Sequence, residues 1–174
     1  YLNYDHLCNK AQNYFLDNCR SSTNMVSKIG IALENFNSLN GAVLKSDGSV
    51  EVWNYGNIDI SNLQNNVKAI SIGSTTGAAL KHNGTVVLWG NRDTGGFNNT
   101  GVDLTNVKAI SMGGSAGAAL KQDGTVVLWG SPGRGGNNNT NVNLTNIKVI
   151  SMGQEAGAAL KENGTVVLWG NSNN

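Results

Sequence analysis

Apolar residues occur along the chain in short runs that predict β-strands joined by tight turns. Residues 67–73 form a run of strand length that is rich in β-branched side chains. Two further apolar runs, 77–81 and 85–90, flank Asn83-Gly84. Asn-Gly between apolar runs is a strong hairpin signal, because both residues accept positive φ in a two-residue turn. The pattern therefore predicts a unit of three short antiparallel strands.

This unit recurs along the chain. Gly-Ala-Ala-Leu-Lys begins at Gly77, Gly117 and Gly157, 40 residues apart, and a divergent copy begins at Gly41. Each copy continues into Asp-Gly or Asn-Gly and then into an apolar stretch that ends in Trp. Two of the units share 18 of 24 positions, which indicates internal duplication. We expect units at about 25–54, 67–90, 107–130 and 147–170, within a repeat domain that covers 25–174.

A three-stranded sheet cannot bury both of its faces alone, so each unit must stack on its neighbours. Short antiparallel sheets that repeat about every 40 residues are typical of a β-propeller. Helical repeats lack hairpin turns, and the rungs of a β-solenoid are usually shorter. We therefore predict an all-β fold of propeller-type blades, each a three-stranded antiparallel sheet, in a partial or open ring.

The repeated sequence resembles that of a known family. Val-Lys-Ala-Ile-Ser-x-Gly, followed by Ala-Leu-Lys-x-Asp/Asn-Gly-Thr-Val-Val-x-Trp-Gly, is similar to the repeats of the regulator of chromosome condensation superfamily. The compact unit looks most like the bacterial branch typified by the β-lactamase inhibitory protein of type II. The resemblance covers residues 41–170. It implies a propeller of which four units form roughly half a ring, since the family usually has about seven blades.

The chain also departs from the family pattern. The family often has His-Thr before its Ala-Leu, where this chain has Thr76-Gly77 and, in later units, Ala-Gly. Its Gly-Gln-Leu-Gly after Trp-Gly is replaced here by Gly-Gly-Phe-Asn at 95–98 and Gly-Gly-Asn-Asn at 135–138. The implied propeller is unaffected by these departures, but they argue against nucleotide exchange on a small GTPase.

Residues 1–24 differ in composition from the repeats and contain both cysteines. Apolar side chains at helical spacing predict a short N-terminal helical segment over about 2–17. On one helix Cys8 and Cys19 would lie about 16 Å apart, too far for a disulfide. If the chain turns near Asp17 they could form a disulfide, and otherwise they are buried thiols. Both alternatives stay open.

Residues 25–36 fit two alternatives. Their apolar side chains recur at helical spacing, yet residues 26–31 also align with the first strand of the next unit, 67–72. We favour the strand, because Gly30 disfavours a helix interior and the following hairpin would otherwise lack its third strand.

Composition and charge exclude several classes of protein. The chain has 12 Lys and Arg against 11 Asp and Glu, so it lacks the basic excess of a nucleic-acid-binding protein. No apolar run approaches the ~20 residues that span a bilayer, so we expect no membrane span. The chain holds 28 Asn and 23 Gly but 1 Pro, which indicates turns built from Asn and Gly. Because it starts at Tyr1, we expect a piece of a longer protein, extracellular or on the cell surface, with a cytoplasmic location left open.

Catalytic motifs are missing from the sequence. The two histidines lie in unrelated segments, and no nucleophile elbow, zinc-protease or Walker motif occurs. Two cysteines do not make a metal site without further ligands. We therefore predict a protein that is not an enzyme and that uses no cofactor and no metal.

Two residue types recur at fixed positions and are interpreted as structural. Identity across all units is what packing demands, so we expect the tryptophans to pack between blades, at Trp53, Trp89, Trp129 and Trp169. The recurring lysines are interpreted as solvated residues that block edge pairing, at Lys68, Lys108, Lys148, Lys81, Lys121 and Lys161.

The positions that vary between otherwise identical units are the candidate binding residues. Repeat scaffolds often place individual residues on one loop face, and that face is often the one that binds. The variable segments are 74–76, 114–116 and 154–156, together with connectors 91–103 and 131–143. From these we select Ser74, Thr75, Thr76, Arg92, Phe97, Ser115, Arg134, Gln154 and Glu155.

The function predicted from these observations is a non-enzymatic protein-binding or assembly module that acts through its loop face. Its partner is another protein, or further subunits or repeats of the same protein. One alternative is a structural surface or extracellular protein that builds a larger assembly. Another is an accessory or carbohydrate-binding domain of a larger enzyme.

Overall fold

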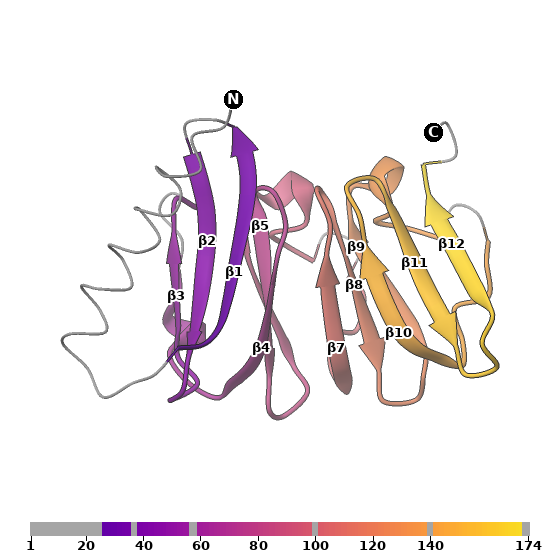
Figure 1. Cartoon of the computed structure of the whole chain (residues 1–174), viewed down its shortest axis with the longest axis horizontal. Coiled ribbons are helices and arrows are strands. Elements are labelled where there is room, and N and C mark those ends of the chain that lie inside the picture. The colour runs from indigo at the N-terminus through magenta and orange to yellow at the C-terminus, as the bar shows by residue number, and fades with distance from the viewer. Residues whose placement is uncertain (1–25, 36–37, 56–58, 99–100, 139–140, 172–174) are drawn as a thin grey trace.

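The computed structural model describes residues 26–35, 38–55, 59–98, 101–138 and 141–171. This part of the chain forms four three-stranded antiparallel sheets, which stand side by side in sequence order (Figure 1). The predicted open arc of blades is therefore confirmed. The predicted N-terminal helix and both cysteines lie outside the described residues. The strands are β1 Val26–Asn35, β2 Ser38–Lys45, β3 Val50–Trp53, β4 Val67–Ile72, β5 Thr76–Lys81, β6 Val86–Gly90, β7 Val107–Met112, β8 Ala116–Lys121, β9 Val126–Gly130, β10 Ile147–Met152, β11 Ala156–Lys161 and β12 Val166–Gly170.

The ambiguous segment at the start of the first unit is a strand. β1 pairs antiparallel with β2 from Val26 opposite Lys45 to Asn35 opposite Ser38. The strand that we favoured over a helix is thus confirmed, and it completes the first blade.

The hairpin turns lie at the four predicted places, but their type differs from the prediction. At each turn only the glycine has positive φ, as at Gly84 with φ +82°. The Gly84 amide donates to Lys81 O at 3.0 Å and the Lys81 amide donates to Thr85 O, which is a type I turn followed by a glycine bulge. Asn83 Oδ1 accepts from the Thr85 amide at 3.0 Å, and this local bond holds the asparagine outside the left-handed region.

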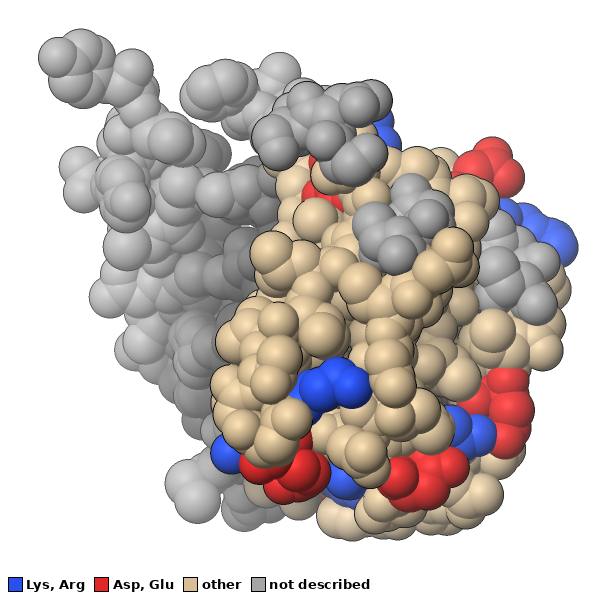
Figure 2. Space-filling view, turned by 90° about the vertical axis from the view of Figure 1, so that its right-hand side faces the viewer, with Lys and Arg blue, Asp and Glu red and all other residues tan. Residues whose placement is uncertain are grey.

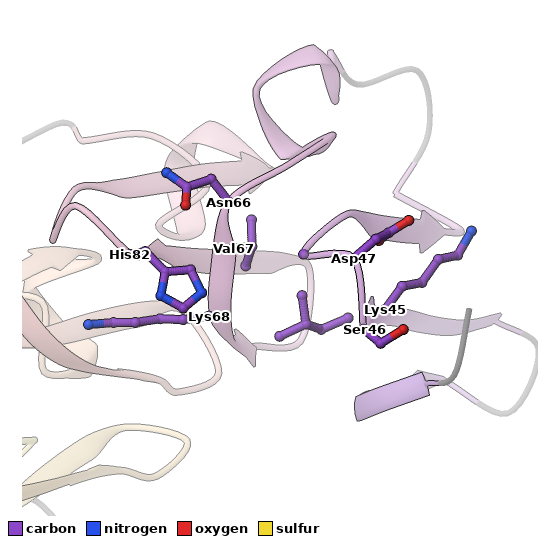
Figure 3. Close-up of a pocket in the computed structure, with 9 residues that line it drawn as sticks. Lys45, Ser46, Asp47, Asn66, Val67, Lys68 and His82 are labelled. Carbon is purple, nitrogen blue, oxygen red and sulfur yellow. The ribbon is translucent and has the colours of Figure 1, made fainter. Parts of the chain in front are cut away.

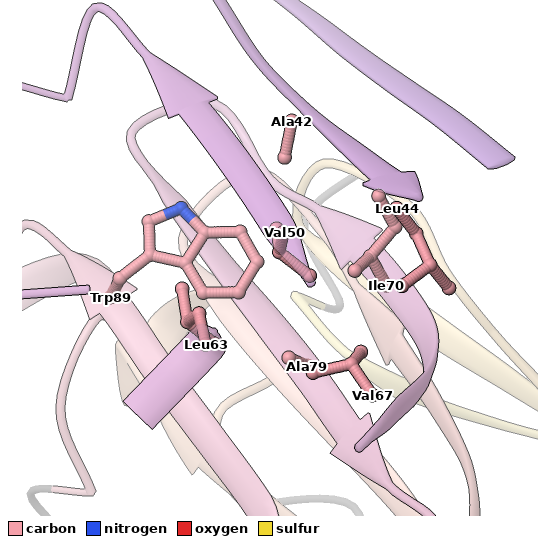
Figure 4. Close-up of a cluster of buried hydrophobic side chains, with 8 residues drawn as sticks. All are labelled: Ala42, Leu44, Val50, Leu63, Val67, Ile70, Ala79 and Trp89. Atoms are coloured by element: carbon pink, nitrogen blue, oxygen red, sulfur yellow. The ribbon is translucent and has the colours of Figure 1, made fainter. Parts of the chain in front are cut away.

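The core lies between neighbouring sheets, where three apolar clusters join one blade to the next. In the first cluster the side chains of β2 and β3 meet those of β4, β5 and β6, together with Leu63 from the short helical turn Ser61–Leu63 (Figure 4). The second and third interfaces repeat this arrangement with Trp129 and Trp169 in place of Trp89. Each sheet is therefore stabilised by its neighbours rather than by a core of its own.

The strand pattern predicts burial of Trp89 and Trp129 and of nine aliphatic residues, namely Leu80, Leu120, Leu160, Ile70, Ile110, Ile150, Val87, Val127 and Val167. The structure confirms this prediction in part. Leu80, Leu120, Ile70, Trp89 and Trp129 are buried as predicted. Several other residues are only half-buried and correct the prediction, namely Leu160, Ile110, Ile150, Val87, Val127 and Val167. Leu160 has the same sequence context as Leu120, but no further sheet from the described residues lies against its face of the last sheet. The presence or absence of a neighbouring sheet therefore decides whether the leucine at this position is buried.

Each tryptophan lies against a glycine of the adjacent strand in its own sheet. Gly117 is the register partner of Trp129, and an added Cβ at Gly117 would lie 2.3 Å from Trp129 Cζ2. The indole N–H of Trp129 donates to Gly95 O at 3.1 Å, in the connector that follows the preceding blade. The predicted packing of tryptophan between units is thus confirmed for Trp89, Trp129 and Trp169, which are at most 3% exposed.

Truncating a core leucine tests the assignment of the inter-blade core. Leu120→Ala should lower the free energy of unfolding by about 2–5 kcal/mol, because it leaves a cavity between the third and fourth sheets. Denaturant unfolding followed by circular dichroism measures the loss. Gln122→Ala, on an exposed turn position of the same hairpin, should stay within about 0.5 kcal/mol of the wild type. Equal stabilities of the two variants would contradict the core assignment.

The glycine beneath each tryptophan is tested by adding one methyl group. Gly117→Ala should destabilise by about 1–3 kcal/mol or more, because the methyl overlaps the Trp129 ring and the backbone strand cannot move aside. The matched control is Gly133→Ala, where a Cβ meets nothing within 4 Å. Thermal melts of both variants should show a loss for Gly117→Ala alone.

Candidate functional site

One end of the strands gathers the variable segments of the sequence. The β4–β5, β7–β8 and β10–β11 loops lie at this end, as do the helical turns Arg92–Thr94 and Pro132–Arg134 that follow β6 and β9. These two turns are the pink and orange coils at the upper edge of Figure 1. We call this surface the loop face.

Backbone hydrogen bonds position the loop face in the same way in each unit. The Asn91 amide donates to Thr75 O at 3.0 Å, and the Ser131 amide donates to Ser115 O at 2.9 Å. In the last unit the equivalent acceptor is Glu155 O, at 3.0 Å from the amide of Asn171. The scaffold bond therefore uses only main-chain atoms, whatever side chain occupies the position.

On the second blade the loop face presents a hydroxyl pair and a cation–aromatic pair. Thr75 and Thr94 share a hydrogen bond of 2.5 Å between their hydroxyl oxygens. The guanidinium of Arg92 lies 4.4 Å from the ring centre of Phe97, and both side chains are exposed. Arg stacked on an aromatic ring offers an apolar surface, hydrogen-bond donors and positive charge at one place.

Between the third and fourth blades the loop face carries an ion pair. Arg134 Nη1 lies 3.7 Å from Glu155 Oε1, and the Asn171 side-chain amide donates to Glu155 Oε2 at 3.0 Å. Gln154 beside this pair is exposed. The sequence predicts Arg134 and Glu155 as separate binding residues and does not reveal their pairing, because they lie 21 residues apart in different units.

Two of the nine selected residues are buried rather than presented. Thr76 is 0% exposed at the start of β5, and Ser115 is 8% exposed next to β8. Both lie where the loop enters the middle strand, which is covered on both sides. The accessible set is therefore Ser74, Thr75, Arg92, Phe97, Arg134, Gln154 and Glu155.

The opposite end of the strands carries a hollow of about 420 Å³ between the first and second blades. Figure 3 shows Lys68 and His82 on one side of it and Lys45 and Asp47 on the other. Lys45 is ion-paired with Glu51. At later interfaces the counterparts of His82 are Gln122 and Glu162. His82 is therefore particular to this hollow, whereas Lys68 and Asn66 recur at the later interfaces.

In the described part of the chain, no three His, Cys, Asp or Glu side chains lie close enough together to hold a metal ion. The same residues include no helix long and apolar enough to cross a membrane.

The titratable group with the clearest perturbation is Asp103, in the connector before the third blade. A hydrogen bond from the Lys121 ammonium, followed by bonds from the hydroxyl and amide of Thr105, lowers the Asp103 pKa to about 2. A carboxylate with a lowered pKa stabilises the fold above its ordinary pKa of 3.8, and this contribution is lost as the pH falls toward 2.

This perturbation is tested by titrating the Asp103 carboxyl by NMR. We expect a pKa of about 2 in the wild type and a higher value in Lys121→Met, because the largest cause of the shift is removed. Thr145→Val, in the next connector, is a control that should leave Asp103 unchanged. An unchanged pKa in Lys121→Met would contradict the assigned cause.

Comparison with known proteins agrees with this architecture. No family model and no curated protein matches the chain. Among solved structures, human WBSCR16 is 18% identical with a TM-score of 0.60, and the match covers 86% of this chain and 48% of that one. The ectodomain of the Physcomitrella patens receptor kinase CR4 is 16% identical with a TM-score of 0.62, and the match covers 86% of this chain and 42% of that one. Prp20p, the RCC1 of Saccharomyces cerevisiae, is 19% identical with a TM-score of 0.61, and the match covers 86% of this chain and 44% of that one.

These likenesses show the fold, which is that of RCC1-like β-propellers. The chain spans about half the length of the structures that it matches. The comparisons agree with the propeller fold that the repeats indicated. They do not support its placement in the bacterial branch.

Proposed function

We propose that this chain is a protein-binding module and that the loop face is its contact surface. One observation carries the proposal: the same backbone hydrogen bond forms in three units at a position whose side chain differs from unit to unit. Thr75, Ser115 and Glu155 accept the same main-chain hydrogen bond, while their side chains differ in size and charge. This backbone bond therefore places no demand on these side chains. Ser115 is buried, and Thr75 and Glu155 are the two that remain accessible for recognition.

The chemistry of the accessible residues fits a protein partner. Arg92 stacked on Phe97 combines an aromatic surface with a guanidinium, and both residue types are enriched where proteins bind one another. Arg134 and Glu155 add a second polar contact point one blade further along. We infer recognition of a protein surface that offers carboxylate or carbonyl acceptors to the guanidinium groups.

Structures with this fold support a binding role. Prp20p was studied for its binding to Gsp1p and histones, and it was also crystallised with Kap60 bound. Those partners are properties of the yeast protein. For this chain we propose protein binding in general, without catalysis, at a location outside the cell or on its surface.

The proposal is tested with two variants from opposite ends of the strands. Arg92→Ala combined with Phe97→Ala should weaken partner binding at least tenfold, because it removes the stacked pair. The control, Lys68→Ala with His82→Ala at the turn end, should bind like the wild type. Both variants should keep the wild-type melting temperature, since all four side chains lie outside the inter-blade clusters.

The measurement is cross-linking to candidate partners from the source organism, followed by affinity determination with the purified partner. Binding that the turn-end variant loses and the loop-face variant keeps would contradict the proposed surface.

A further inference from the structure

The four hairpin turns form the same side-chain hydrogen bond whether they contain aspartate or asparagine. The residue before the turn glycine alternates along the chain, as Asp47, Asn83, Asp123 and Asn163. In every blade its Oδ1 accepts from the amide two residues further on, at 2.9–3.0 Å. In the first three blades the hydroxyl of that further residue also donates to Oδ1, at 2.6–2.8 Å. The turn therefore accommodates a carboxylate and an amide equally.

The turn uses the side-chain oxygen of this residue and leaves the nitrogen of asparagine unused. A carboxylate can only accept hydrogen bonds, so the bonds at Asp47 and Asp123 require nothing but an acceptor. Asn83 is exposed, and its Nδ2 donates no hydrogen bond within the described part of the chain. Asn98 differs, because its Nδ2 donates to Val102 O at 2.7 Å. Exchange of the Asn83 nitrogen for oxygen therefore removes no bond of the turn.

The residue that follows each turn asparagine is glycine, at Gly84 and Gly164. Glycine has no side chain to hold its backbone nitrogen away from the side-chain carbonyl of the preceding residue. Asn83 and Asp123 are exposed although further blades follow them, so solvent reaches this turn position in the interior of the arc. The turn thus places an exposed side-chain amide next to the least hindered backbone nitrogen.

We propose that Asn83 and Asn163 are sites of spontaneous deamidation, and that the turn keeps its hydrogen bonds in the aspartate product. The Gly84 nitrogen attacks Asn83 Cγ, so a bond from nitrogen to Cγ forms and the bond from Cγ to Nδ2 breaks. Nδ2 leaves as ammonia with the proton of the Gly84 amide. Water then opens the cyclic imide, which gives aspartate or, at the other carbonyl, isoaspartate. The reaction consumes one water and releases one ammonia, without an oxidant or a cofactor.

The folded turn controls the rate of this reaction. Gly84 is buried and its amide donates to Lys81 O at 3.0 Å, while two bonds from Thr85 hold Asn83 Oδ1. The attack requires these bonds to open, as hairpin tips do in local unfolding. Asn163 Oδ1 accepts from one amide alone among the described residues. We therefore expect slower deamidation in the folded chain than in the unfolded chain, and faster reaction at Asn163 than at Asn83.

The aspartate product adds negative charge at the turn end of the strands. Figure 2 shows Lys, Asp and Glu side chains together along the lower edge, which is the turn end in Figure 1. At Asp47 and Asp123 the hydroxyl and amide two residues further on, and then Lys45 and Lys121, lower the pKa below 3.8. Two conversions take the formal net charge of +1 below zero. The loop face lies at the other end, so the inference does not depend on the proposed function.

The test is incubation of the full chain in mildly alkaline buffer, folded and in denaturant, followed by peptide mapping with mass spectrometry. We expect the mass increase of an NH₂-to-OH exchange at Asn83 and Asn163, roughly tenfold slower in the folded chain. The internal control is Asn143, which is exposed and makes the same two bonds to Thr145 but precedes Leu144. It should remain unchanged over the same time.

Variants of the second hairpin separate the parts of the proposal. Thr85→Val removes the hydroxyl donor and should accelerate the reaction at Asn83 roughly two- to tenfold, the range that one ordinary hydrogen bond supports. Asn163 in the same variant should react as in the wild type. Asn83→Asp should melt with the wild type, whereas Asn83→Ala, which lacks the acceptor, should melt at a lower temperature.

Several outcomes would overturn the proposal. One is a folded chain that gains no mass at Asn83 and Asn163 after the denatured chain has converted, and another is equal reaction at Asn143. A denatured chain that does not react would also refute it. A lower melting temperature of Asn83→Asp would show that the turn does not accommodate the product.

Discussion

The fold depends on the contact between the tryptophan in the third strand of each blade and the glycine opposite it in the middle strand of the same blade. The spacing from glycine to tryptophan is 12 residues in every unit, from Gly41 and Trp53 to Gly157 and Trp169. At each of these glycines a Cβ would lie 2.1–2.3 Å from the ring, so no other residue fits without moving the indole. In the third and fourth blades the same indole then bonds to the preceding connector. One side chain thus fixes the sheet, its distance from the preceding sheet and the course of the connector between them.

The first interface shows what happens when part of this arrangement is missing. The connector after the first blade is shorter and lacks the Gly-Gly turn that supplies the carbonyl acceptor to Trp129 and Trp169. The Trp89 indole nitrogen is buried and has no hydrogen-bond partner among the residues that the structure describes. Tyr55 packs edge-on against Trp89 instead, with ring centres 6.1 Å apart. An aromatic contact replaces a hydrogen bond there, which marks the first blade as a different kind of unit.

Prediction from sequence succeeded where the determinants were local and repeated. The hairpins and the strand order follow from Asn-Gly, Asp-Gly and apolar runs, which act within a few residues. The turn type was missed because it depends on a hydrogen bond that the Thr85 amide donates to Asn83 Oδ1. The burial of Thr76 and the pairing of Arg134 with Glu155 were missed because they arise from the packing of one unit on another. Burial at Leu160 likewise depends on whether another sheet follows, which its own sequence does not encode.

The abundance of asparagine also has a structural explanation that separates the scaffold from the loop face. Asn side chains close the connectors, as when Asn98 both donates to Val102 O and accepts from the Val102 amide. Other asparagines adopt left-handed backbone conformations that favour Asn or Gly, as at Asn66 and Asn106. Connector geometry is thus fixed by Asn and Gly, and sheet packing by Trp, Gly, Leu and Ala. The exposed side chains of the loops between the first two strands of each blade have neither duty, so they can change without a loss of stability. A binding surface can diverge in this way while the repeat beneath it stays nearly identical.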